Sequence, residues 1–151
     1  MEDIFDGSVL ENITVGKSYL SVQDAIDALE KTGIYDWVNG LPDGLNTNLV
    51  SGGKGLPRSM VLKLILARCI AKKPSLIVLN DYFSSLSRKD KIRLIKMLSA
   101  TENNWSLIAV SNDPLIMQAC DKVIVLDKGR IVGDGTFKDL QEQNMLAEFI
   151  D

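Results

Sequence analysis

The residues best placed to do chemistry are Asn80 and Asp81, which directly follow an apolar run at 76–79. That run, bounded by Pro74 and a polar pair, is typical of a short strand buried on both faces. Open α/β sheets place their ligand sites at the carboxyl ends of strands, so the pair is a candidate site. Asp81 could act as a base, whereas the neutral amide of Asn80 is a weak partner for a hard cation. The place of this pair in the predicted sheet is typical of a nucleotide or metal site. Its side chains are not, because the first of them is an amide.

The composition excludes several other kinds of site. The chain has no histidine, which rules out imidazole metal ligands and histidine-activated nucleophiles. Its two cysteines, Cys69 and Cys120, are too few for a disulfide framework or a metal cluster, and a reducing compartment is expected. A formal charge of -3 gives no basic surface for nucleic acid.

Length and hydropathy indicate one soluble domain. The chain of 151 residues is 46% hydrophobic and 25% charged, which is ordinary for a globular protein. The longest apolar run, 60–70, contains Lys63 and Arg68 and is too short to span a bilayer. The first residues lack a basic segment followed by an apolar one, so no signal peptide is expected. Any association with a membrane would therefore depend on a partner.

Helices are expected in the first half of the chain. Ser8 lies near the N-cap of a short helix, and Ser21 with Asp24 forms a capping box for a helix that stops at Gly33. A short helix at 34–39, a turn at 41–44 and a flexible loop at 51–55 follow. A helix at 57–71 is expected next, with Pro57 at its first position.

The second half alternates between strands and helices. After the strand at 76–79, Ser87 could cap a helix that runs to about residue 98. The remaining predictions are a second buried strand at 105–110, a helix at 114–119, a strand–turn–strand at 123–132 and a helical stretch from 136 to near 150. This order predicts an α/β fold without internal repeats, in a single domain over 1–151. Residues 8–71 are mainly helical, and residues 75–151 form the α/β portion.

Several segments together resemble one family. Residues 5–13, the turn Leu-Pro-Asp-Gly at 41–44, Leu-Ala-Arg at 66–68, the strand ending at Asn80 and the hairpin at 126–136 have the composition and spacing of an ATP-binding cassette (ABC) domain. The chain resembles the C-terminal part of the nucleotide-binding domain of exporter-type ABC transporters, over nearly all of its length. The resemblance implies a helical subdomain and the C-terminal part of a RecA-like P-loop NTPase core, that is, a partial ABC ATPase domain.

One match within this resemblance is misleading. Val-Ser-Gly-Gly-Lys at 50–54 looks like the family's Leu-Ser-Gly-Gly-Gln signature. Counting without gaps from Leu41 to Arg68 instead places the signature on five other residues: Leu56, Pro57, Arg58, Ser59 and Met60. We therefore interpret Ser51, Gly52 and Gly53 as a surface loop.

In this register every recognisable catalytic position is altered. Asn80 replaces the Walker B aspartate that helps to hold magnesium, and Asp81 replaces the glutamate that orients water. Asn112 stands at the switch histidine and Ser87 at the aspartate that ends the D-loop. Pro57 removes an amide from the signature. Asn80 and Asp81 could instead end a strand, Asn112 or Asp113 could cap the helix at Pro114, and Ser87 could cap its own helix.

Arg58 adds to these changes, because it places a bulky side chain where glycine allows close approach of a phosphate. Its charge could still attract phosphate. Together the substitutions predict a site no longer maintained for hydrolysis.

The resemblance also implies cofactors and partners. ATP and Mg²⁺ are the family's ligands, but the family's P-loop would precede Phe5, so this chain alone is expected to bind neither and to be inactive. Its expected partners are a second nucleotide-binding domain and a transmembrane domain, with no nucleic acid and no direct membrane insertion. The expected location is the cytoplasmic face of the membrane. Two alternatives are open: an interaction or scaffold module that kept the fold, and a working ATPase that uses Asp81 as its base.

Overall fold

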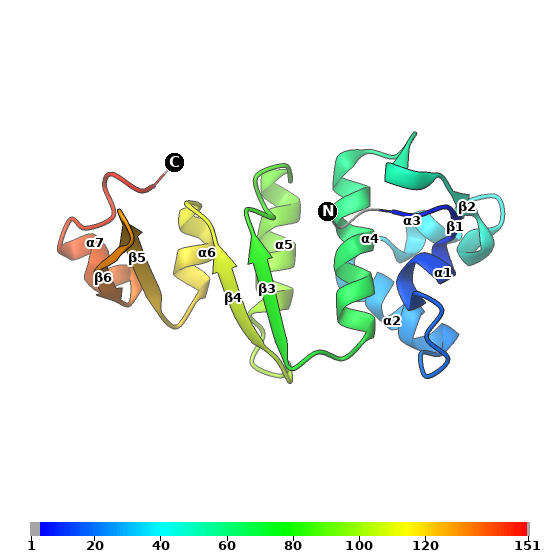
Figure 1. The fold of residues 1–151 in the computed structure, drawn as a ribbon, viewed down its shortest axis with the longest axis horizontal. Helices are drawn as coiled ribbons and strands as arrows, with labels where there is room; N and C mark the ends of the chain where they lie inside the picture. Colours follow the sequence, from blue (N-terminus) through cyan, green and yellow to red (C-terminus); the bar gives the residue numbers. More distant parts are fainter. Residues whose placement is uncertain (1–3, 151) are drawn as a thin grey trace. The chain divides into compact units, whose positions relative to one another are not determined.

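The computed structural model describes residues 4–150, which divide into two compact units (Figure 1). The first unit comprises the chain up to Ile77 together with Asn104–Ser106. The second comprises Val78–Asn103 and the chain from Leu107 onward. The class is mixed α/β, as the sequence predicted.

Helices build most of the first unit. They are α1 (Val9–Thr14), α2 (Val22–Thr32), α3 (Tyr35–Asn39) and α4 (Arg58–Ala71), with 3₁₀ turns at Gly44–Asn46 and Ser51–Gly53. Ser8 and Ser21 cap α1 and α2 through capping boxes, and Gly33 ends α2 in the left-handed conformation, as predicted. Helix α4 packs against α1 and α2 and buries most of its length. Pro57 is its N-cap and not its first helical residue.

A pair of two-residue strands that the sequence analysis missed closes this unit. Strand β1 (Gly7–Ser8) pairs antiparallel with β2 (Asn48–Leu49). Next to it, the backbone amide of Ser51 donates to Asp6 Oδ1 at 2.8 Å and the amide of Gly52 donates to the Ile4 carbonyl at 2.8 Å. The segment predicted to be a flexible loop is thus a turn anchored to residues 45 or more positions earlier in the chain.

The second unit begins as strand–helix–strand–helix. Its elements are the larger part of β3 (Leu76–Asn80), α5 (Arg88–Leu98), the larger part of β4 (Ser106–Val110) and α6 (Pro114–Ala119), close to the predicted ranges. Strands β3 and β4 pair and run in the same direction (Figure 1). The amide of Ser106 donates to the Ser75 carbonyl at the start of the pair, and the amide of Asp81 donates to the Val110 carbonyl at its end. The carboxyl ends of both strands therefore lie side by side.

The prediction that both strands are buried on two faces is wrong. In β3, Ile77 and Leu79 are buried while Val78 is 60% exposed, and in β4 Ile108 and Val110 are more than half exposed. An apolar run is compatible with burial on both faces, but burial itself depends on whether another layer covers the second face. Among the described residues, no layer covers the second face of this two-stranded sheet.

The chain ends with a hairpin and one helix. Strand β5 (Val123–Asp127) pairs antiparallel with β6 (Arg130–Gly135), and α7 (Phe137–Glu142) follows. A small core joins these elements to α6; its buried members are Met117, Val123, Val125, Leu140 and Leu146. The helix predicted to reach residue 150 ends at Glu142, because Asn144 adopts the left-handed conformation (φ 57°) and turns the chain so that Leu146 packs back into this core.

Candidate functional site

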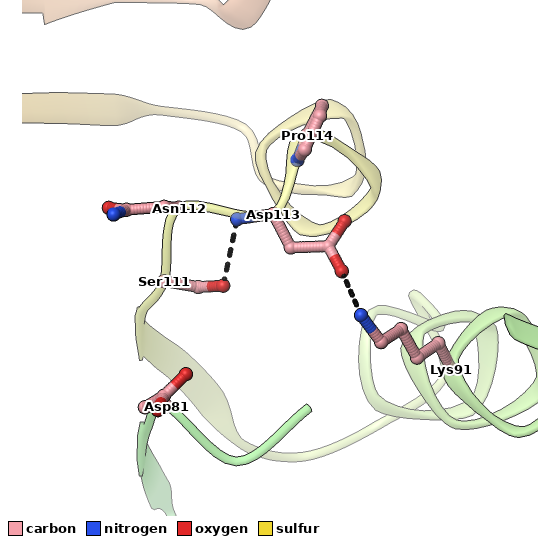
Figure 2. A pocket seen from close by; sticks show the side chains of 6 residues that line it. All are labelled: Asp81, Lys91, Ser111, Asn112, Asp113 and Pro114. Carbon is pink, nitrogen blue, oxygen red and sulfur yellow. Dashed lines mark hydrogen bonds and ion pairs between the residues drawn. The ribbon is translucent and has the colours of Figure 1, made fainter. Parts of the chain in front are cut away.

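A pocket of about 160 Å³ lies where β3 and β4 end, within the second unit (Figure 2). Six residues line it: Asp81, Lys91, Ser111, Asn112, Asp113 and Pro114. The pocket thus combines the loop after β3, the first turns of α5, and the loop that leads from β4 into α6. The structure brings together Asp81 and Asn112, two residues that the sequence analysis selected 31 positions apart.

Asp81 occupies a constrained backbone position. It follows β3 directly and adopts the left-handed conformation (φ 47°), which is uncommon for a residue other than glycine but tolerated best by Asp and Asn. Its amide is held by the Val110 carbonyl at 2.9 Å, and its own carbonyl accepts a hydrogen bond from the Ser84 hydroxyl at 3.1 Å. Its side chain is exposed and lines the pocket. The backbone is therefore fixed while the carboxylate is available to a ligand.

Asp113 uses both of its carboxylate oxygens. Oδ1 accepts a hydrogen bond from the amide of Leu115 at 3.0 Å and so caps α6, while Oδ2 lies 2.6 Å from Lys91 Nζ on α5. Burial alone would raise the pKa of Asp113, but the hydrogen bonds from Lys91 and Leu115 and the charges of Lys91 and Arg88 outweigh it and lower the pKa. Asp113 is therefore an anion with two fixed partners. Ser111 Oγ in turn accepts a hydrogen bond from the Asp113 amide at 3.1 Å.

The other predicted positions have different surroundings. Asn80 is the exposed last residue of β3, next to the pocket but not among its lining residues. Ser87 caps α5: its hydroxyl accepts from the amide of Asp90 at 3.2 Å and donates to the Asp90 carboxylate at 3.0 Å. The capping role that the sequence left open for Ser87 is present in the structure. At α6 the cap is Asp113 and not Asn112.

The signature-position residues belong to the first unit. Leu56 and Pro57 lead into α4, Arg58 is its first residue, and Ser59 and Met60 follow in its first turn. The side chain of Arg58 is exposed. The segment 56–60 therefore lies at the N-terminus of α4, with its last three residues inside the helix. The competing segment Ser51–Gly53 is a 3₁₀ turn, separated from α4 by four residues.

Lys91 is the pocket residue that the sequence analysis missed. Its spacing to Leu94, Ile95 and Leu98 places it on the buried face of α5, where it is the charged member of an otherwise apolar stripe. The cap at Ser87 fixes the start of this helix, so the stripe places Lys91 at the end of α5 nearest to the carboxyl ends of the strands. A lysine at this position in an otherwise apolar helical stripe is the sequence feature that could have identified Lys91 as a pocket residue.

The donor set does not form a magnesium site by itself. Mg²⁺ is usually held by one or two carboxylates together with phosphate oxygens and water. Here Asp113 is committed to Lys91 and Leu115, so Asp81 is the available carboxylate of the pocket, with neutral amides at Asn80 and Asn112. Within residues 4–150, no cluster of three or more acidic, cysteine or histidine side chains could hold a metal ion.

Comparison with known proteins gives relatives of one kind. No protein-family model matches the chain. It is 31% identical over 144 residues to ABC transporter B family member 7 of Dictyostelium discoideum, and 28% identical over 144 residues to an ATP-dependent lipid A-core flippase of Francisella tularensis. It is 26% identical over 137 residues to the alpha-hemolysin translocation ATP-binding protein HlyB of Escherichia coli O157:H7. These matches cover 91–95% of this chain and 17–24% of the relatives.

A solved structure agrees with these matches in fold. A bacterial Atm1-family ABC exporter with ATP bound superposes with a TM-score of 0.86 at 22% identity, over 97% of this chain and 26% of the exporter chain. The resemblance to ABC transporters is therefore confirmed over nearly the whole of this chain. The chain spans less than a quarter of the length of the curated relatives named above. Among its described helices, none has the length and apolar character needed to cross a bilayer.

Proposed function

We propose that this chain is the C-terminal part of the nucleotide-binding domain of an exporter-type ABC transporter, with a degenerate hydrolytic site. One observation carries the proposal: the pocket at the ends of β3 and β4 holds Asp81 and Asn112, the residues at the family's glutamate and histidine positions. At these positions the acid is shorter than glutamate by one methylene, and an amide stands where the resemblance implies an imidazole.

The arrangement supports binding better than turnover. A misplacement of about 1 Å in a catalytic group can reduce a rate by about 100-fold, and Asp81 is one carbon shorter than glutamate. An amide at Asn112 can donate a hydrogen bond to a phosphate but cannot exchange a proton near neutral pH. The pocket residues thus support a domain that responds to a bound nucleotide without hydrolysing it efficiently.

The proposal extends to architecture and partners. Residues 8–71 would comprise the helical subdomain and the signature helix, with roughly residues 8–50 facing the transmembrane domain. Residues 75–151 would belong to a RecA-like core. The domain would pair with a second nucleotide-binding domain at the cytoplasmic face of the membrane. ATP and Mg²⁺ would bind at a site that also uses the P-loop of a complete domain.

The test is a chimera in which this chain replaces the matching segment of the Francisella tularensis lipid A-core flippase. ATP binding is measured by calorimetry, and hydrolysis by phosphate release. The proposal predicts binding with hydrolysis reduced by at least about 100-fold. A control chimera carrying Pro57→Ser, Arg58→Gly, Asn80→Asp, Asp81→Glu and Asn112→His should recover hydrolysis, which shows that the chimera folds.

Two outcomes would contradict the proposal. Efficient turnover that disappears on Asp81→Ala would mean that Asp81 is a working base and the site is not degenerate. Absence of ATP binding in the first chimera, with binding and turnover in the control, would favour a scaffold module that kept the fold and lost nucleotide chemistry. The exposed aliphatic face of β3 and β4 is the observation that favours this second function, because it offers an apolar surface for another polypeptide.

A further inference from the structure

The loop between β4 and α6 carries Asn112 between two anchors. On one side, the Val110 carbonyl accepts the hydrogen bond from the amide of Asp81 at 2.9 Å, which ties the end of β4 to the end of β3. On the other side, Asp113 caps α6 and reaches Lys91 on α5. Asn112 itself is exposed, and its side chain leaves the loop on the side opposite to the ion pair (Figure 2).

The contact between Lys91 and Asp113 joins parts that are distant in sequence. The two residues are 22 positions apart, and both side chains are largely buried, at 21% and 18% exposed. A charge-assisted hydrogen bond of this kind is stronger than one between neutral groups, and partial burial limits its screening by water and salt. The cap alone orients α6, whereas Lys91 fixes the loop relative to α5.

We propose that Lys91 is a positioning residue of the pocket: through Asp113 it holds the 111–113 loop so that Asn112 and Asp81 line the same cavity. Within residues 4–150, Lys91 forms no hydrogen bond or ion pair with either of these two side chains, and it acts through Asp113. This inference deepens the proposed function, because it concerns the same pocket. It describes the conformation of the 111–113 loop, and its test needs no nucleotide. Each can therefore fail without the other.

The structure separates the ion pair from the helix cap. Lys91→Met keeps the aliphatic stem and removes the charge, and it leaves Asp113 Oδ1 in place as the cap of α6. Lys91→Arg keeps the charge and should retain the loop. Asp113→Asn preserves a capping oxygen, because Asn is as good an N-cap as Asp, but it loses the charge that pairs with Lys91. Lys89→Met is the matched control, since Lys89 is an exposed lysine of the same helix.

The measurement is amide hydrogen exchange of the complete chain by NMR, with the side-chain amide resonances of Asn112 as a second probe. Lys91→Met and Asp113→Asn should each accelerate exchange at 112–113 by about tenfold, the order expected for loss of one charge-assisted hydrogen bond. They should also move or broaden the Asn112 side-chain signals. Lys91→Arg and Lys89→Met should leave both unchanged.

Three results would overturn the inference. Exchange at 112–113 that is the same in Lys91→Met as in Lys89→Met would show that the ion pair does not hold the loop. Failure of Lys91→Arg to retain the wild-type Asn112 signals would show that a positive charge at this position is not what holds the loop. Accelerated exchange spread evenly over the whole second unit would indicate general destabilisation in place of positioning.

Discussion

Replacement of Gly53 by alanine should destabilise the first unit through two separable effects. Gly53 is buried in the left-handed conformation (φ +66°), and a Cβ atom there would lie 2.5 Å from Val61 Cγ2 and 3.6 Å from Ile4 Cγ1. A non-glycine residue in this conformation costs about 1–2 kcal/mol. Overpacking against Val61, a buried residue of α4, adds about 1–3 kcal/mol. The expected loss is therefore about 2–5 kcal/mol in the free energy of unfolding.

Gly52 provides a control that isolates the packing effect. It has nearly the same backbone conformation (φ +73°), but a Cβ atom there would meet nothing within 4 Å. Gly52→Ala should therefore cost only the conformational part, about 1–2 kcal/mol. Both tryptophans, Trp37 and Trp105, belong to the first unit, so urea unfolding followed by tryptophan fluorescence reports on the unit that contains both glycines.

The urea midpoint of Gly53→Ala should fall below that of Gly52→Ala by about 0.5–2 M, since slopes are about 1–3 kcal/mol per molar urea. Equal midpoints for the two variants would refute the packing argument and the anchored position of this turn. A Gly53→Ala midpoint equal to that of the wild type would refute the left-handed backbone as well.

Two further predictions concern charge and exposed surface. The hydrogen bond from Lys73 at 2.7 Å, with those from Ser21, holds the pKa of Asp24 well below its usual range. The stabilisation from ionised Asp24 is complete above about pH 5 and is lost progressively as the pH falls through the folded-state pKa. Urea titrations at pH 7 and pH 3 should therefore show that Asp24→Asn destabilises the chain at both pH values, and by less at pH 3, where part of the stabilisation is already lost; a pH-independent difference would contradict this. The exposed aliphatic side chains of β3 and β4 should make the chain alone associate reversibly, and the double variant Val78→Lys with Ile108→Lys should sediment as a monomer with unchanged circular dichroism. Association that persists in the double variant would place the contact elsewhere.

The parts of the fold that local chemistry determines could be predicted from the sequence. Ser8, Ser21 and Ser87 each cap the helix that the sequence assigned to them, because a cap needs only the three residues that follow it. Gly33 ends α2 for a similarly local reason. Pro57 likewise placed the start of α4 within one residue.

The features that the sequence analysis missed depend on distant partners. The pairing of β1 with β2 joins residues about 40 positions apart in strands of only two residues, which leave no periodic pattern. The exposure of Val78 depends on which layers cover the sheet and not on the apolar run itself. The contact between Lys91 and Asp113 joins α5 to the N-cap of α6, 22 positions later in the chain. The sequence therefore identified Asp81 and Asn112 as pocket residues but not the ion pair beside Asn112.

The cap at Ser87 has a consequence for how such a site changes over evolutionary time. Ser, Asp and Asn are nearly equal as N-caps, so α5 begins equally well with serine as with the aspartate that the family resemblance implies at this position. Asn80 is similarly free of folding constraints, since its side chain is exposed at the end of β3. Folding stability therefore does not distinguish these two residues from the aspartates that the family resemblance implies at their positions. Once hydrolysis is no longer selected, such residues can drift while the protein folds as before, and the chemistry of the site is lost well before its shape.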